Sequence, residues 1–99
     1  MKANLILHVK KEDAQGNITE MVLWKLPASS PDRPHGIKYR CYHGDNLGHC
    51  MVRYDNETGK GDHKHIGDRE VPYKFVSVEK LVRDFIDDVN YLSRKENEL

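Results

Sequence analysis

The fold is decided by the stretch 78-VEKLVRDFIDDVNYL-92, where apolar residues recur at the spacing of a helix. That spacing places the apolar side chains on one stripe of the helix, while charged side chains occupy the rest of its surface. The stripe consists of Val78, Leu81, Val82, Phe85, Ile86, Val89 and Leu92. The side chains expected to face water are Glu79, Lys80, Arg83, Asp84, Asp87 and Asp88. Since Ser77 is a favourable N-cap residue, we predict one amphipathic C-terminal helix that begins just after it.

Upstream of this helix the apolar residues alternate with polar ones, which is the pattern of strands with one buried face. The first alternating run spans residues 5–9, and the second spans 18–26 after a turn-forming segment. A second pair of runs covers 37–43 and 49–55. These runs predict two antiparallel hairpins, with Trp24 in the core.

Three further segments complete the expected architecture. Residues 27–36 contain three prolines and a glycine, which predicts an exposed loop. Residues 56–69 are charged and rich in glycine, so we expect a connection that buries no core. Residues 71–76 read as a short extended piece at a sheet edge because of Pro72. We therefore predict an α+β fold in which the helix packs on an antiparallel sheet of about four to five strands.

Length and composition limit the classes of protein to which the chain can belong. The chain has 99 residues, 37% of them apolar, and its 16 Lys and Arg balance its 16 Asp and Glu. This length predicts a single domain over residues 1–99. Its apolar runs are far shorter than the roughly 20 residues that cross a bilayer, and charges near the start break any signal peptide. We therefore expect a cytoplasmic protein without a membrane span, in which any affinity for nucleic acid comes from a local surface.

The chemistry-bearing stretch is 53-RYDNETGKGDHKHIG-67. In an extended segment, His63 and His65 project to the same side. Two imidazoles that titrate near neutrality suit cleavage of a phosphodiester, because one can take the proton of a ribose 2′-hydroxyl while the other protonates the leaving 5′-oxygen. This route requires neither a metal nor another cofactor.

Charged neighbours complete this candidate site. Lys60 or Arg53 would stabilise the charge on phosphorus, and Asp62 or Asp55 would orient a histidine. The acid and base roles within the histidine pair stay open. The competing interpretation is a solvated loop, since a His-x-His pattern alone is weakly specific. The predicted catalytic residues are His63, His65, Lys60, Asp62, Arg53 and Asp55.

Metal binding is an alternative that the residue types allow. Soft ligands lie on both sides of a short turn, which would suit zinc, although their order matches no common zinc-finger spacing. These ligands are Cys41, His43, His49 and Cys50. A second set could hold a catalytic divalent ion, and it comprises Asp62, His63 and His65. The tyrosines are expected to pack on the sheet, where one beside the histidines could stack on a base.

Several blocks of the sequence resemble the TumE-type toxin family of prokaryotic toxin-antitoxin systems. The blocks are 1-MKA-3, 5-LILH-8, 20-EMVLW-24, 34-PHGIKYR-40, 54-YDNE-57, 59-GKGDH-63 with His65, and 77-SVEKL-81. The resemblance implies a small toxin that is neutralised by a co-expressed antitoxin, typically of the helix-turn-helix type. Residues 41–50 depart from the family pattern, which weakens the zinc interpretation.

Together, the residues and the resemblance favour a toxin that cleaves RNA without a metal, with an antitoxin and RNA as partners. Small antiparallel sheets with one helix also carry metal-independent ribonuclease toxins, although this is an analogy of fold alone. The alternatives are a non-enzymatic adaptor that binds a protein through the loop at 59–63, a zinc-binding toxin, and a transferase that modifies RNA. A homo-oligomer is compatible with the sequence, and the charged helix face is a candidate surface for a basic partner.

Overall fold

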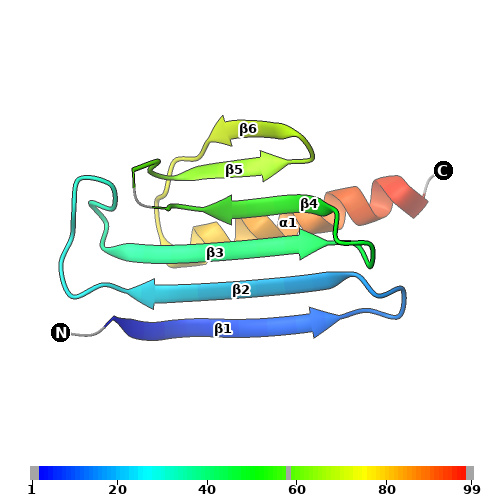
Figure 1. Ribbon diagram of the computed structural model, residues 1–99, viewed down its shortest axis with the longest axis horizontal. Coiled ribbons are helices and arrows are strands. Elements are labelled where there is room, and N and C mark those ends of the chain that lie inside the picture. Colours follow the sequence, from blue (N-terminus) through cyan, green and yellow to red (C-terminus); the bar gives the residue numbers. More distant parts are fainter. Residues whose placement is uncertain (1–2, 58, 98–99) are drawn as a thin grey trace.

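Six strands followed by one helix make up residues 3–57 and 59–97, which are the residues that the computed structural model describes (Figure 1). The elements are β1 (Asn4–Glu12), β2 (Ile18–Lys25), β3 (Ile37–Gly44), β4 (Cys50–Asp55), β5 (His63–Ile66), β6 (Arg69–Pro72) and α1 (Val78–Asn97). The predicted α+β class is confirmed, as are the two hairpins and the C-terminal helix. Among these residues no helix combines the length and the apolar character needed to span a bilayer.

The strands form one antiparallel sheet in the order β1-β2-β3-β4-β5-β6, so every strand pairs with its neighbour in the sequence. The sheet has more strands than predicted because β5 and the start of β6 lie in the segment that we expected to be a connection. Gly67, with φ of 60°, begins the two-residue turn that joins them. A strand ladder is built from backbone groups, so polar side chains do not prevent it from forming.

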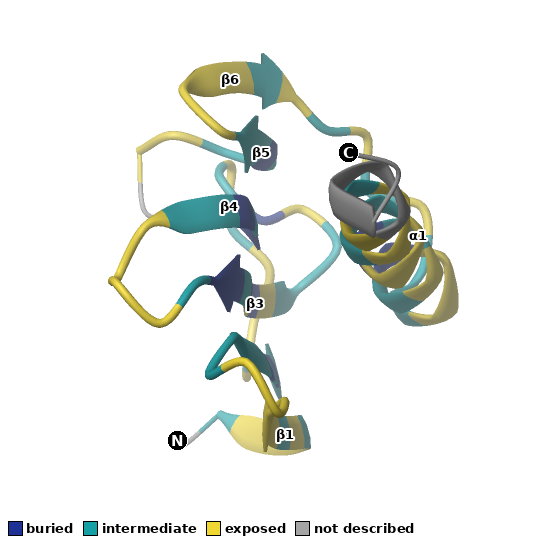
Figure 2. Cartoon of the chain, turned by 90° about the vertical axis from the view of Figure 1, so that its right-hand side faces the viewer, coloured by how far each residue is buried: buried dark blue, intermediate teal, exposed yellow. Residues whose placement is uncertain are grey.

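The helix covers one face of the sheet and leaves the other face open. Figure 2 shows α1 on one side of the strands, and it packs against β4. The buried core lies between the helix and the sheet. Its residues are Met21, Leu23, Tyr39, Cys41, Val52, Tyr54, Leu81 and Phe85. The Ser77 hydroxyl accepts a hydrogen bond from the Lys80 amide at 3.1 Å, which confirms the N-cap. Ile86, at the margin of the stripe, is exposed instead of buried.

The prediction that Trp24 belongs to the core is wrong. In β2 the residues under the helix are Met21 and Leu23, whereas Trp24 is only partly buried. Both faces of β2 carry apolar residues, so the alternation alone could not tell which face is covered. Pairing of Met21 with Cys41 and of Leu23 with Tyr39 settles this, and a register shift of one residue would exchange the two faces.

Hydrogen bonds to tyrosines tie the helix to the sheet, so the expectation that Asp84 and Asp88 face water is wrong. The Tyr54 hydroxyl donates a hydrogen bond to Asp88, and the Tyr73 hydroxyl donates one to Asp84 at 2.7 Å. Burial, reinforced by these carboxylates, raises the pKa of both tyrosines. Burial opposes ionisation of Asp84, but hydrogen bonds from Lys80 and Tyr73 outweigh it and lower the pKa of that carboxyl. The two aspartates, one helical turn apart, therefore fasten α1 to β4 and to the segment after β6.

Tyr54→Phe keeps the buried ring and removes the hydroxyl that contacts Asp88. Hydrogen bonds to charged groups contribute about 1.5–3 kcal/mol, and we expect a loss near the lower end because Asp88 is partly exposed. Urea unfolding measures the change. Tyr91→Phe is the matched control, since Tyr91 is an exposed tyrosine on the same helix. Equal stability of Tyr54→Phe and the wild type would contradict this account.

The same bond predicts a loss of stability in alkali. An unfolded tyrosine ionises near pH ~10, whereas the folded-state pKa of Tyr54 is raised above that value. The stabilisation is therefore complete below pH ~10 and is lost as the pH rises toward the folded-state pKa. Between about pH 9 and pH 11, Tyr54→Phe should lose less free energy of unfolding than the wild type.

Candidate acid-base site on the open sheet face

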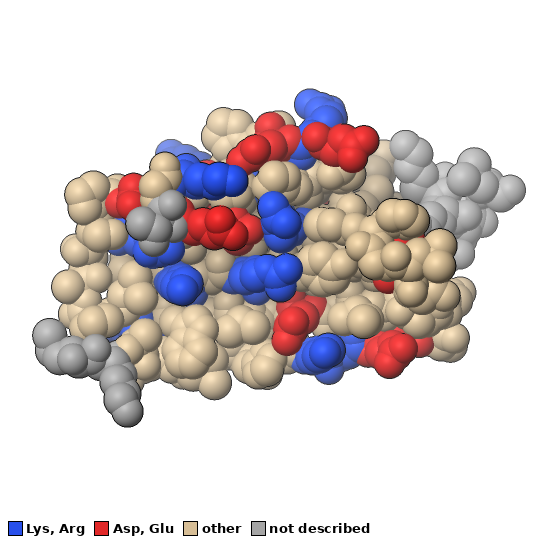
Figure 3. Space-filling view, viewed as in Figure 1, with Lys and Arg blue, Asp and Glu red and all other residues tan. Residues whose placement is uncertain are grey.

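Two rows of side chains cross the open face, because the strands pair in one continuous register. The first row runs Arg40, Asp55, His63 and Pro72 across β3 to β6. The second row runs Tyr42, Arg53, His65 and Glu70 across the same strands. Figure 3, viewed from the side opposite α1, shows Lys and Arg side chains gathered over the middle of this face. The register therefore brings together four of the predicted catalytic residues, namely Arg53, Asp55, His63 and His65.

His63 is buried, with a side chain 6% exposed, and both of its ring nitrogens face acceptors. Its Nδ1 donates a hydrogen bond to the carbonyl oxygen of Gly61 at 3.0 Å. Its Nε2 lies 2.7 Å from Oδ1 of Asp55 and 3.7 Å from Oε1 of Glu70. A carbonyl oxygen only accepts, so Nδ1 carries a hydrogen, and an unprotonated Nε2 would direct its lone pair at carboxylates. A hydrogen on Nε2 suits the carboxylates that this nitrogen faces.

His65 differs from His63 in facing a cation, although its Nε2 also lies 3.9 Å from Oε1 of Glu70. Nη2 of Arg53 lies 3.0 Å from Nε2 of His65, and a guanidinium can only donate, so this nitrogen accepts. The His65 side chain is 19% exposed, which makes it the more accessible of the two imidazoles. The two rings lie edge to face with their centroids 5.1 Å apart. Two imidazoles therefore lie side by side, one with Asp55 and the other with Arg53 beside its Nε2.

Asp55 lies between His63 and Arg53 and contacts both of them. Its carboxylate is 3% exposed and also lies 3.0 Å from Nε of Arg53 through Oδ2. Within the described part of the chain, neither Oδ1 of Asp55 nor Nε of Arg53 has a hydrogen-bond partner. Their contacts with His63 and with each other have the distances of ion pairs without the alignment of hydrogen bonds. Buried charged atoms left in this way are costly, and a catalytic role is one recognised reason for keeping them.

Asp62 lies next to His63 in the sequence but turns toward other residues. Its carboxylate lies 3.1 Å from Nε2 of His35 and accepts a hydrogen bond from the Tyr39 hydroxyl at 2.7 Å. Asp62 thus contacts a histidine, but this histidine is His35. The 27–36 loop is also less exposed than predicted, because Arg33 is buried and donates to the Asn56 carbonyl at 2.9 Å.

Lys60 is exposed in the turn before β5, where its backbone amide donates to the carbonyl oxygen of Glu57 at 3.1 Å. In the same turn the Gly59 amide donates to the Asp32 carboxylate at 3.0 Å. The structure therefore fixes the backbone of this turn through residues outside the histidine pair. It does not bring Lys60 into contact with His63 or His65 in the way that it does Arg53 and Asp55.

The four residues considered for zinc do not converge. Cys41 and His43 are buried, with Nδ1 of His43 2.8 Å from the Thr19 hydroxyl, whereas His49 is exposed and bonds Asp45. Burial also raises the pKa of the Cys41 thiol to about 12, which disfavours the thiolate that a metal would need. Cys41 and His43 are buried on the helix side of β3, whereas His49 lies in the exposed turn after that strand.

One group with the spacing of metal ligands does occur among residues 3–57 and 59–97. It comprises His63, His65 and Glu70, whose ligand atoms all lie within 4.8 Å of one another. Glu70 replaces Asp62 of the predicted divalent-ion set. A cation there would lie beside the Arg53 guanidinium, which already contacts His65. This arrangement fits proton transfer better than metal binding.

Glu70 was missed because the predicted edge segment began at Val71, one residue after it, whereas β6 begins at Arg69. Glu70 pairs with His65 across β5 and β6, and the signal was the two-residue Gly67-Asp68 segment between Ile66 and Arg69. A two-residue connection with glycine first is typical of a β-hairpin turn. Recognising that turn would have placed Glu70 opposite His65.

Long-range ¹H–¹⁵N spectra at neutral pH test the two imidazole states directly. We expect a hydrogen on Nε2 of His63, which faces carboxylates, and a lone pair on Nε2 of His65, which accepts from Arg53. Asp55→Asn removes the carboxylate 2.7 Å from Nε2 of His63 and should change the ¹⁵N shift of that nitrogen. Two identical imidazole states in the wild type would contradict the assignment.

Comparison with known proteins gives a family but no individual relative. A model of the family described as Toxin TumE matches residues 4–92. No curated protein and no solved structure matches the chain. The matched range covers all six strands and most of α1.

Proposed function

The chain belongs to the TumE toxin family, and from this membership and the open-face site we propose that it is a ribonuclease toxin acting by histidine acid-base chemistry. Membership makes the protein the toxin component of a toxin-antitoxin system, with a cognate antitoxin as its partner. Cleavage of RNA, without a metal or other cofactor, is the proposed activity.

The observation that carries the proposal is the contrast between the two imidazoles. His63 has acceptors at both nitrogens, whereas Nε2 of His65 accepts from Arg53. Acid-base cleavage needs one protonated and one unprotonated group within reach of the same phosphate. Asp55 maintains the contrast, because its carboxylate lies beside the His63 ring and anchors Arg53.

The reaction assigns a role to each group. Nε2 of His65 takes the proton of the ribose 2′-hydroxyl, whose oxygen attacks phosphorus. His63 gives its proton to the 5′-oxygen as the phosphorus–oxygen bond breaks, so the products are a 2′,3′-cyclic phosphate and a 5′-hydroxyl. Arg53 releases His65 and donates to the phosphate oxygens, where negative charge builds up. Glu70, which is 51% exposed, can swing away from Nε2 of His63, so that the 5′-oxygen approaches this nitrogen on the side away from Asp55.

The remaining predicted residues have supporting roles in this proposal. Lys60, exposed in the glycine-flanked turn before β5, adds a cation that can approach a bound phosphate from the loop. Asp62 fixes the start of β5 through His35 and Tyr39, so it acts as a positioning residue. We further propose a helix-turn-helix antitoxin and a cytoplasmic location, where the RNA would be reached.

His63→Ala and His65→Ala should each relieve growth arrest, because each removes one of the two proton-transfer groups. General acid-base catalysis contributes about 10²- to 10⁴-fold, so cleavage of RNA by the purified variants should fall by that order. Circular dichroism checks the fold, and His63→Gln retains a donor toward Gly61 if the alanine variant is unstable. His8→Ala is the control, since His8 is an exposed histidine that bonds Glu20. Full toxicity of both site variants would overturn the proposal.

The RNA assay run with and without EDTA separates the alternatives. Cleavage that persists in EDTA supports the metal-independent route, and cleavage abolished by EDTA favours an ion held by His63, His65 and Glu70. A product of increased mass would indicate a transferase. RNA left intact under all conditions would favour an adaptor that acts by binding a protein.

A further inference from the structure

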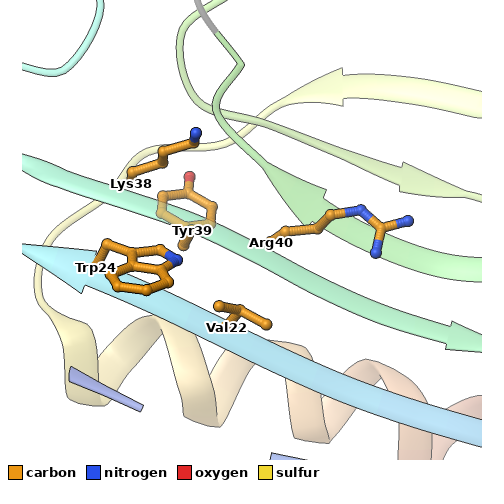
Figure 4. Close-up of a pocket in the computed structure, with 5 residues that line it drawn as sticks. All are labelled: Val22, Trp24, Lys38, Tyr39 and Arg40. Atoms are coloured by element: carbon orange, nitrogen blue, oxygen red, sulfur yellow. The ribbon is translucent and has the colours of Figure 1, made fainter. Parts of the chain in front are cut away.

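A hollow on the open face leads from Trp24 toward the histidine pair. One cavity of about 230 Å³ is lined by Val22, Trp24, Lys38, Tyr39 and Arg40 (Figure 4). A second, of about 260 Å³, is lined by Lys38, Tyr39, Arg40, Asp55, Asn56 and Glu57. The two share Lys38, Tyr39 and Arg40, so they adjoin across β3. The hollow therefore reaches Asp55, whose carboxylate contacts His63.

The strand register explains this continuity. Trp24 pairs with Lys38, Val22 pairs with Arg40, and Arg40 in turn pairs with Asp55. Figure 4 shows the indole on β2 beside the two cationic side chains on β3. Neighbouring strands lie about 4.8 Å apart, so the three steps from β2 to β5 span roughly 14 Å.

The chemistry of this hollow is that of a binding surface for single-stranded nucleic acid. An indole offers a flat face on which any base can stack, and Lys38 and Arg40 are exposed cations that can contact phosphates. Arg40 is also oriented, because its guanidinium carbon lies 5.2 Å from the centre of the Tyr42 ring. An aromatic platform followed by cations is the arrangement that proteins use for strands without strict sequence preference.

We propose that single-stranded RNA binds along this hollow, with one base stacked on Trp24 and the adjoining phosphates on Lys38 and Arg40. The strand then continues over β4 to His63 and His65. The inference rests on the proposed function, since it names the surface that delivers the RNA to that site. It also accounts for a large aromatic side chain on the uncovered face of β2.

Trp24 is the only tryptophan in the chain, so its fluorescence reports the proposed stacking directly. A short single-stranded oligoribonucleotide with 2′-O-methyl groups is the probe, because it lacks the attacking hydroxyl and stays intact. We expect saturable quenching of the Trp24 emission, and weaker binding as the salt concentration rises. A fluorescently labelled copy of the same oligoribonucleotide gives the concentrations at which the probe is bound. Absence of Trp24 quenching at those concentrations would overturn the proposal.

Variants measured with a fluorescently labelled probe test the separate contacts. Trp24→Leu should weaken binding by about fivefold or more, whereas Trp24→Tyr, which can still stack, should retain most of the affinity. Lys38→Ala and Arg40→Ala should each reduce the slope of log affinity against log salt by about 0.7. Lys11→Ala is the charge-matched control, because Lys11 pairs with Thr19 and lies on the opposite face, and it should leave the slope unchanged.

The outcomes distinguish this surface from the catalytic proposal. Quenching and loss of affinity in Trp24→Leu, with no cleavage of unmodified RNA, would support the surface while the ribonuclease proposal fails. If unmodified RNA is cleaved and Trp24→Leu binds the probe with unchanged affinity, the proposed RNA-binding surface is overturned and the ribonuclease proposal stands. Loss of cognate antitoxin binding in Trp24→Leu, with probe binding unchanged, would also overturn it and assign the face to the antitoxin.

Discussion

The pairing of β4 with β5 is the constraint on which the rest of the site depends. It sets Asp55 opposite His63 and Arg53 opposite His65, so four charged or titratable side chains meet on one face. A shift of β4 and β5 together by one residue against β3 would turn this set toward the helix and bring Tyr54 and Lys64 to the open face. Because the same shift would remove Tyr54 from the core, the packing under α1 fixes the register that builds the site.

The face of the sheet under the helix holds the core, and the open face holds the candidate site. Under the helix, Tyr54 and Tyr73 bury their rings and direct their hydroxyls at Asp88 and Asp84, which satisfies the polar groups of the interface. On the open face, Asp55 is also buried, but its Oδ1 has no hydrogen-bond partner among the described residues. The core under the helix therefore stabilises a fold whose open face leaves buried polar atoms without hydrogen bonds among the described residues.

Much of this architecture was predictable from the sequence, because the alternation in 37–43 and 49–55 and the helical stripe after Ser77 are strong local signals. The extended geometry of 63–65 placed both histidines together, whereas the face on which Arg53 lies depended on the register of the second hairpin. The buried face of β2 was not predictable, since Val22 and Trp24 are as apolar as Met21 and Leu23. The β5–β6 hairpin was missed because its strands are polar, and the partner of Asp62 depended on a loop whose return to β5 has no local signal.

The central claim is that His63 and His65 act as an acid and a base on one phosphate. The pH dependence of RNA cleavage by the purified toxin, measured in EDTA, tests it most directly. One acid and one base predict a bell-shaped profile, and His65→Ala should remove the limb that depends on the base. A rate that is independent of pH, or the same profile in His65→Ala, would contradict the claim.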